Sequence, residues 1–351
     1  MSSATAAATP AREEVLALDL ALPHGRLRPS RLHPEVDTVR AEHDAWFRAV
    51  LTDVQLPGSE RLFRECEGVS LLCRVLPDAE AERLVGICVA ASALFLLDDV
   101  ADDEAGERAR ADDYLAVLHD AAPSAPGSAP LRLLARTLTR ARAGVPARLW
   151  ARFVAGFSEV IAAGAGKAEA SVDGYESYLD ARYADSAFDL VGVAIEHGLG
   201  VDLTLTRAAA PEAAWDALHR ACFVHTILVN DLLSFRKEYF GAEPMNALSV
   251  LGRTEGLSLQ QAADTVCARI AAAEDAFLTH TATLRAAAAD ADPGLQLNLD
   301  RYLTAWELML SGNLTWSLGC PRYHGTTGPQ RRPDDPLPTR MELHRDRTVF
   351  R

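Results

Sequence analysis

Several features that would assign a protein to a special class are missing from this sequence. Its six cysteines form no CxxC pair and lie mostly in apolar stretches, so we expect reduced core thiols in a cytoplasmic protein. The first residues have neither a basic start nor an apolar core, and they do not predict a secretory signal. The longest apolar run, residues 84–97, is too short to cross a hydrocarbon layer of about 30 Å as a helix. We therefore expect a buried helix there and no stable insertion into a membrane.

The chain also lacks an excess of positive charge. Its formal net charge is −14, which argues against a nucleic-acid partner, because phosphate binding requires a clustered basic face. An acidic protein that binds an anion has to do so locally, through a few arginines or through metal ions.

Alternating β-branched runs bounded by turn residues are nearly absent, whereas alanine, leucine, arginine and glutamate are abundant. This composition predicts an all-α protein. The breaks between helices are short and no period of roughly 20 to 50 residues repeats, which favours one domain and disfavours a solenoid. The expected helices are 37–53, 58–74, 79–103, 108–121, 130–141, 146–165, 171–183, 185–199, 211–239, 258–288 and 294–317.

The two ends of the chain differ from the middle. Residues 1–14 are small and polar, and residues 324–351 are rich in proline and charge without periodicity. We expect a folded domain over residues 15–323 between two ends that are mobile at least without ligand.

The buried helix ends in a dense acidic cluster, LFLLDDVADDE. Asp98 and Asp102 are four residues apart, and Asp99 and Asp102 are three apart, so these carboxylates share one helical face. They repel one another, and the helix dipole disfavours negative charge at a C-terminal end. A bound divalent cation would relieve both effects, and oxygen ligands suit magnesium. The alternative is a solvated acidic helix end.

A second cluster lies in the stretch NDLLSFRKE (230–238). Asn230, Ser234 and Glu238 are four residues apart, so they form a column of oxygens on one helical face. An amide, a hydroxyl and a carboxylate oxygen can together hold one hard cation. The alternative here is a helix end that emerges into solvent.

Together the two motifs resemble those of the class I terpene cyclases of bacterial type, in which an aspartate-rich DDxxD motif precedes an NDxxSxxxE motif. Two further signatures of that family follow the same order. The stretch YLDARYADSAFDLVG offers Arg182 before a helix kink and small residues, although position 186 is serine where many relatives have glycine. An Arg-Tyr pair, Arg322 and Tyr323, follows the tryptophan-bearing NLTWS stretch. The resemblance covers roughly residues 40–325.

The resemblance implies a single-domain, class I terpenoid synthase-like helical bundle around a central active-site cavity, with three Mg²⁺ ions at the rim. It implies a lyase that ionises a linear prenyl diphosphate, cyclises the carbocation and releases diphosphate. The implied metal ligands are Asp98, Asp99, Asp102, Asn230, Ser234 and Glu238. The implied diphosphate-binding residues are Arg182, Lys237, Arg322 and Tyr323. The implied catalytic residues are Arg182, Asp185, Ser186 and Tyr323.

A dry apolar pocket should keep the carbocation from water, and an aromatic face stabilises a cation by roughly 0.5 to 2 kcal/mol. The candidates for its wall are Phe95, Phe188, Phe223, Trp306 and Trp316, although aromatics on buried helices usually belong to the core. Where family members often carry an aromatic residue, shortly before the first aspartate, this chain has Ser92 and Ala93. With Ala91 and Ala187, these small residues favour geranylgeranyl diphosphate slightly over farnesyl diphosphate.

Two other functions stay open. A prenyl-chain-elongating transferase shares the fold and the metals, but such enzymes resemble a pattern with two DDxxD motifs. A non-catalytic helical interaction domain with acidic faces would turn over no diphosphate. The proposed chemistry requires no redox cofactor, and we allow for a homodimer.

Overall fold

The computed structural model describes residues 15–56, 59–60, 63, 67–103, 111–124, 127–166, 172–208, 210–241, 245–325 and 335–351. For residues 98–103, 164–166 and 185 it describes the backbone but not the side chains. Residues 1–14, which we expected to be mobile, lie outside this part. The described chain is mostly helical with one small sheet, and the predicted all-α class is confirmed.

The first part of the chain contains the helices α1 (Val36–Val54), α3 (Gly68–Val75), α4 (Ala81–Asp103), α6 (Ala111–Leu118), α7 (Ala129–Ala141) and α8 (Ala147–Gly166). The middle contributes α9 (Tyr175–Asp185), α10 (Phe188–Leu199) and α11 (Thr204–Ala208). The long helices come last: α12 (Glu212–Gly241), α14 (Leu259–Ala287) and α15 (Pro293–Ser317), with the short α13 (Ala247–Glu255) and α16 (Pro321–His324).

Local sequence signals explain where the two last long helices begin. Ser258 precedes α14, and its hydroxyl accepts the Gln261 N–H while the Gln261 side chain accepts the Ser258 N–H at 2.9 Å. Asp292 precedes α15 and accepts the Gly294 N–H at 2.8 Å, with Pro293 in the first turn. Both arrangements satisfy N–H groups that have no partner inside the helix.

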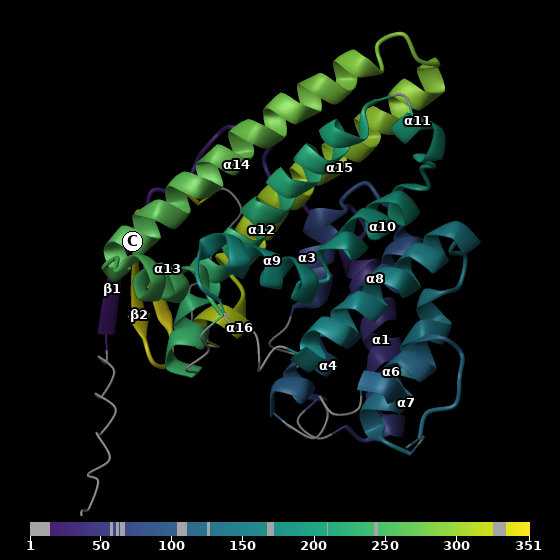
Figure 1. The fold of residues 1–351 in the computed structure, drawn as a ribbon. Helices are drawn as coiled ribbons and strands as arrows, with labels where there is room; N and C mark the ends of the chain where they lie inside the picture. The colour runs from purple at the N-terminus through teal and green to yellow at the C-terminus, as the bar shows by residue number, and fades with distance from the viewer. Residues whose placement is uncertain are drawn as a thin grey trace, which may run out of the picture.

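The helices are arranged around two apolar clusters. The larger cluster joins α3, α10, α12, α14 and α15, and the second joins α1, α4, α6, α7 and α8. Figure 1 shows α14 running along the outer side of α12 and α15, with the second group of helices on the opposite side. None of the helices in the described ranges combines the length and the apolar character that a membrane crossing requires.

The C-terminal segment differs from the prediction that residues 324–351 are mobile. Two strands, β2 (Arg340–His344) and β3 (Thr348–Phe350), pair with each other and with β1 (Val15–Asp19) in an antiparallel sheet of order β1-β2-β3. Met341 and Leu343 are fully buried, while their neighbours on β2 face outward, so a two-residue alternation anchors the strand. Residues 326–334 lie outside the described part.

Candidate active site

The predicted column of oxygens is present on α12. Ser234 is buried, Asn230 and Glu238 are half-buried, and the Ser234 hydroxyl donates to Glu238 Oε1 at 2.5 Å. One turn earlier the Asn230 side chain stands on the same face. The helical spacing therefore gives the geometry that the sequence predicted, while the role of these residues as metal ligands stays a prediction.

Two segments distant in the sequence bring polar groups to the top of this column. Arg182, on α9, donates from Nη2 to Asn230 Oδ1 at 3.3 Å, and its side chain is only 15% exposed. The Asn230 amide donates in turn to the Tyr323 hydroxyl of α16 at 2.7 Å. Arg182 and Tyr323, both expected to bind the diphosphate, therefore lie on either side of Asn230, which is expected to bind a metal ion.

A buried carboxylate that the sequence analysis did not single out supports this group. Asp231 is fully buried and accepts hydrogen bonds from the Tyr178 hydroxyl and from the Ala247 N–H at 2.6 Å. Arg182 Nη2 lies 3.5 Å from its Oδ1. Burial raises the pKa of Asp231 above its usual range, and the adjacent Arg182 guanidinium opposes that rise. The Asp231 carboxylate thus helps to hold the Arg182 guanidinium next to Asn230.

Asn246 is a second supporting residue. It is fully buried, and its amide donates to Glu238 Oε2 and to the Asp231 carbonyl, both at 2.7 Å. Its side-chain oxygen caps α13 by accepting the Leu248 N–H. An asparagine just before an apolar helical stretch is a sequence signal for such a cap. That signal would have located the missed helix α13, whereas the contact to the column depends on how α13 packs against α12.

The expected kink lies between α9 and α10. The first helix ends at Asp185 and the second begins at Phe188, and Ala187 between them has a φ of 55°. Ser186 donates from its hydroxyl to the Tyr183 carbonyl at 3.2 Å. The Asp185 side chain lies outside the described part, so the catalytic roles of Asp185 and Ser186 stay predictions.

The other two predicted cations differ in exposure. Lys237 is exposed, and Arg322 is half-buried in α16. Arg236, between the column residues, is buried and donates to backbone carbonyls of the C-terminal part of the chain. Among these cations, Arg182 has a direct hydrogen bond to the column.

Three of the five aromatic candidates come together. Phe188 contacts Phe223 edge to face at a ring-centroid distance of 5.4 Å, and it contacts Trp306 at 5.3 Å. Trp316 lies apart from them, edge to face with Tyr323 at 5.4 Å. Phe95 is half-buried on α4. The sequence thus located one aromatic cluster of α10, α12 and α15 and two residues outside it.

Two of the small residues that suggested a wide cavity are packed instead. The Ser92 hydroxyl forms a hydrogen bond with His43 Nε2 of α1 at 3.0 Å, and Ser92 is 5% exposed. Ala93 is 1% exposed and belongs to the cluster that contains Phe47 and Leu51. These positions face α1 and leave no additional room, so they do not support a preference for the longer substrate.

The donors on α12 fit a hard divalent cation. Among the side chains that the structure describes, no three histidine, cysteine, aspartate or glutamate residues come together as a metal site. A cation at this position would therefore depend on the Asn230 and Ser234 oxygens as well as on Glu238, an all-oxygen set that suits Mg²⁺. Asp98, Asp99 and Asp102 lie in the last turns of α4, where the side chains are outside the described part.

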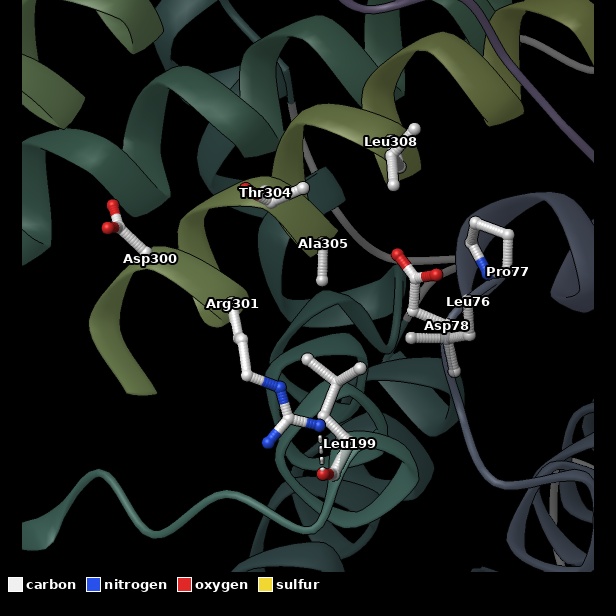
Figure 2. Close-up of a pocket in the computed structure, with 9 residues that line it drawn as sticks. All are labelled: Leu76, Pro77, Asp78, Leu199, Asp300, Arg301, Thr304, Ala305 and Leu308. Carbon is white, nitrogen blue, oxygen red and sulfur yellow. Dashed lines mark hydrogen bonds between the residues drawn. The ribbon is translucent and has the colours of Figure 1, made fainter. Parts of the chain in front are cut away.

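A pocket of about 230 Å³ lies elsewhere on the molecule. Its apolar floor includes Leu76, Leu199 and Leu308, and Arg301 at its edge donates to the Leu199 carbonyl at 2.7 Å (Figure 2). It contains none of the predicted site residues. We therefore do not identify this pocket with the active site.

Comparison with known proteins finds relatives over most of the chain. The family described as "Terpene synthase family 2, C-terminal metal binding" matches residues 90–276. A (3S,6E)-nerolidol synthase of Selaginella moellendorffii is 30% identical over 311 residues, which are 86% of this chain and 82% of that protein. The ophiobolin F synthase of Aspergillus clavatus is 32% identical over 164 residues, which are 46% of this chain and 21% of that protein.

Solved structures show the same arrangement of helices. Germacradien-4-ol synthase from Streptomyces citricolor has a TM-score of 0.70 at 21% identity, over 85% of this chain and 97% of that one. A hedycaryol synthase in complex with HEPES has a TM-score of 0.71 at 21% identity, over 85% and 98% of the two chains. At such identities the likeness shows the fold.

Proposed function

The chain belongs to the terpene synthase family and is a class I terpene synthase, and from this premise we propose that it ionises a linear prenyl diphosphate and cyclises the resulting carbocation. The observation that carries the proposal is the meeting of Arg182, Asn230 and Tyr323 at the oxygen column of α12. The bacterial type is a narrower prediction, because the relatives include proteins of Selaginella and Aspergillus.

The described residues divide the task between them. Arg182 presents a planar pair of donors to diphosphate oxygens, a geometry that lysine cannot reproduce. The Tyr323 hydroxyl, held by Asn230, adds a neutral donor on the same side. Divalent metal ions held by Asn230, Ser234 and Glu238, and on the other side by Asp98, Asp99 and Asp102, would neutralise charge on the leaving diphosphate. The family description supports metal binding, and three Mg²⁺ ions are our proposal.

For substrate length we propose farnesyl diphosphate ahead of geranylgeranyl diphosphate, which reverses the preference drawn from the sequence. That preference rested partly on Ser92 and Ala93, which are packed against α1. A protein named sesquiterpene synthase 3, from Postia placenta, is 25% identical over 87% of this chain and 83% of its own. A sesterterpene synthase of Colletotrichum orbiculare matches over only 46% of this chain and 22% of its own.

The experiment offers purified protein the C10, C15, C20 and C25 prenyl diphosphates separately, with Mg²⁺ and with EDTA. We expect a cyclic terpene from the C15 diphosphate in Mg²⁺ and none in EDTA. Longer diphosphates as products would indicate the chain-elongating transferase instead. No turnover of any substrate would favour the non-catalytic interaction domain.

A further inference from the structure

Arg236 joins the C-terminal part of the chain to α12. Its side chain lies on α12 between the column residues Ser234 and Glu238, yet it points to a different face of the helix. Its Nε donates to the Tyr323 carbonyl at 2.7 Å, and its Nη1 donates to the Arg345 carbonyl at 2.8 Å. The residue is 8% exposed. A buried guanidinium thus holds two backbone carbonyls that are 22 residues apart in the sequence (345 minus 323).

The first of these carbonyls belongs to the residue whose hydroxyl reaches the site. Asn230 holds the Tyr323 hydroxyl, and Arg236 holds the Tyr323 backbone, so α12 contacts both ends of the same tyrosine. Asn230 and Arg236 are six residues apart, which is about 9 Å along the helix axis. The two contacts together fix where the phenol lies and how it is tilted.

The second carbonyl belongs to the turn between β2 and β3, which is itself anchored. Met341 and Leu343 of β2 are buried in the larger apolar cluster, and β2 pairs with β1 along its whole length. The sheet also holds α16 directly, because His324 Nδ1 and Thr348 Oγ1 form a hydrogen bond at 3.0 Å. Gly325 follows with a φ of 80°, and a Cβ there would collide with the Asp346 carbonyl. The sheet of β1, β2 and β3, which we call the terminal sheet, is therefore a fixed support next to Tyr323.

We propose that Arg236 is a positioning residue for the reaction. By binding both the terminal sheet and the Tyr323 backbone, it holds the Tyr323 hydroxyl in a fixed place relative to that sheet. The inference rests on the proposed function, because it assigns Tyr323 a contact with the diphosphate. Arg236 itself takes no contact with substrate in this proposal. Its guanidinium places the tyrosine so that the hydroxyl meets the diphosphate in one geometry, and small displacements of such a group reduce catalysis strongly.

A purely structural role for Arg236 makes a different prediction, and a double-mutant cycle separates the two. If Arg236 acts through Tyr323, the variant that combines Arg236→Met with Tyr323→Phe should turn over substrate no more slowly than Tyr323→Phe alone. If Arg236 only stabilises the fold, the two losses should multiply. The cycle is measured as kcat and KM with prenyl diphosphate and Mg²⁺, at a temperature well below the melting temperature of every variant.

We expect Arg236→Met to lower kcat about tenfold or more with a smaller change in KM, and Arg236→Lys to recover part of that loss. Thr348→Val, which keeps shape but removes the bond to His324, should lower kcat in the same direction without touching Arg236. Arg347→Gln is the matched control, because this exposed arginine of the same turn forms an ion pair with the neighbouring Asp346 at 3.1 Å. Its kcat and KM should equal those of the wild type.

Two measurements do not depend on turnover. Amide hydrogen exchange of residues 320–325 should be faster in Arg236→Met than in the wild type and unchanged in Arg347→Gln. Inorganic diphosphate with Mg²⁺, titrated calorimetrically, should bind Arg236→Met about fivefold or more weakly. If the wild type is active, either of two results overturns the inference. One is that the losses of the two single variants multiply in the cycle, and the other is that amide exchange and diphosphate affinity are unchanged in Arg236→Met. A wild type without turnover, but with faster exchange in Arg236→Met, overturns the proposed function and leaves the positioning contact standing.

Discussion

At the scale of single residues, a substitution in the column on α12 should weaken metal binding without unfolding the protein. The Ser234 hydroxyl donates to Glu238 Oε1 at 2.5 Å, and the residue is 1% exposed. Ser234→Ala should therefore keep the helical circular dichroism but raise the Mg²⁺ concentration that gives half-maximal turnover, by about tenfold or more. Ser311→Ala is the control, because that hydroxyl donates to the Leu308 carbonyl on α15. Equal Mg²⁺ requirements in both variants would remove Ser234 from the ligand set.

The second residue-scale prediction concerns the guanidinium of Arg182. Arg182→Lys keeps the positive charge but loses the planar fork. We expect kcat to fall about 100-fold, because the diphosphate is no longer held in one geometry. The melting temperature should fall much less. Arg220→Lys, at an exposed pair with Glu176, should have no effect on kcat. Wild-type turnover in Arg182→Lys would show that the residue does not sense the diphosphate.

The contacts around Asp231 mark the limit of sequence reasoning at this scale. The spacing of Asn230, Ser234 and Glu238 sufficed to predict the column, because a helix repeats every 3.6 residues. The bonds of Asp231 to Tyr178 and Ala247 depend instead on how α9 and α13 pack against α12. No local pattern encodes that packing.

At the scale of elements, the close approach of α3 and α15 gives a sharp test. A Cβ added to Gly312 of α15 would lie 2.8 Å from the Arg74 carbonyl of α3, where no side chain can yield. Gly312→Ala should destabilise the protein by about 1 to 3 kcal/mol in urea unfolding, because the two helices have to separate.

The matched substitution is Gly86→Ala, inside α4. A Cβ there meets nothing within 4 Å. This variant should gain roughly 0.5 to 1 kcal/mol, because alanine favours a helix over glycine. Equal effects of the two substitutions would contradict the close approach.

The helices of more than ten residues were predicted, and so were the eight-residue α3 and α6, whereas α11, α13, α16 and the three strands were missed. The apolar periodicity of α12, α14 and α15 extends over many turns and identifies each helix without tertiary information. The nine residues of α13 offer little more than two turns, so only the cap at Asn246 distinguishes them. The five residues of β2 alternate as a strand should, but their pairing partner β1 lies more than 300 residues away, and no local signal connects the two.

At the scale of the whole molecule, stability should depend on pH through His324. Burial lowers its pKa to about 4, whereas an unfolded histidine titrates near 6.5. Between these values the unfolded state binds a proton that the folded state excludes, so stability falls as pH decreases from about 6.5 to 4. The loss is at most about 3 kcal/mol. His324→Gln should make this slope shallower in urea titrations, and the substitution of exposed His24 by glutamine should not. Part of the slope remains in both variants, because burial also lowers the pKa of His219 to about 4. Parallel slopes would contradict the buried neutral imidazole.

The terminal sheet should also contribute to global stability. Leu343→Ala leaves a cavity in the larger apolar cluster and should cost about 2 to 5 kcal/mol. Arg340→Ala, on the outward face of the same strand, removes an exposed pair with Asp19 and should cost no more than about 1 kcal/mol. Urea unfolding measures both. A negligible effect of Leu343→Ala would restore the expectation of a mobile C-terminal segment.

The pairing of β1 with β2 has a consequence for the time course of biosynthesis. Asp19 and Arg340 are 321 residues apart, and ribosomes add about 5 to 20 residues per second. The first strand therefore waits roughly 15 to 65 seconds for its partner to be translated. Until then Leu18 of β1 lacks its partner Met341 of β2, and α16 with Tyr323 lacks the sheet that supports it. The nascent chain can assemble its long helices while it is still attached to the ribosome, but it completes this support only once translation has passed residue 350.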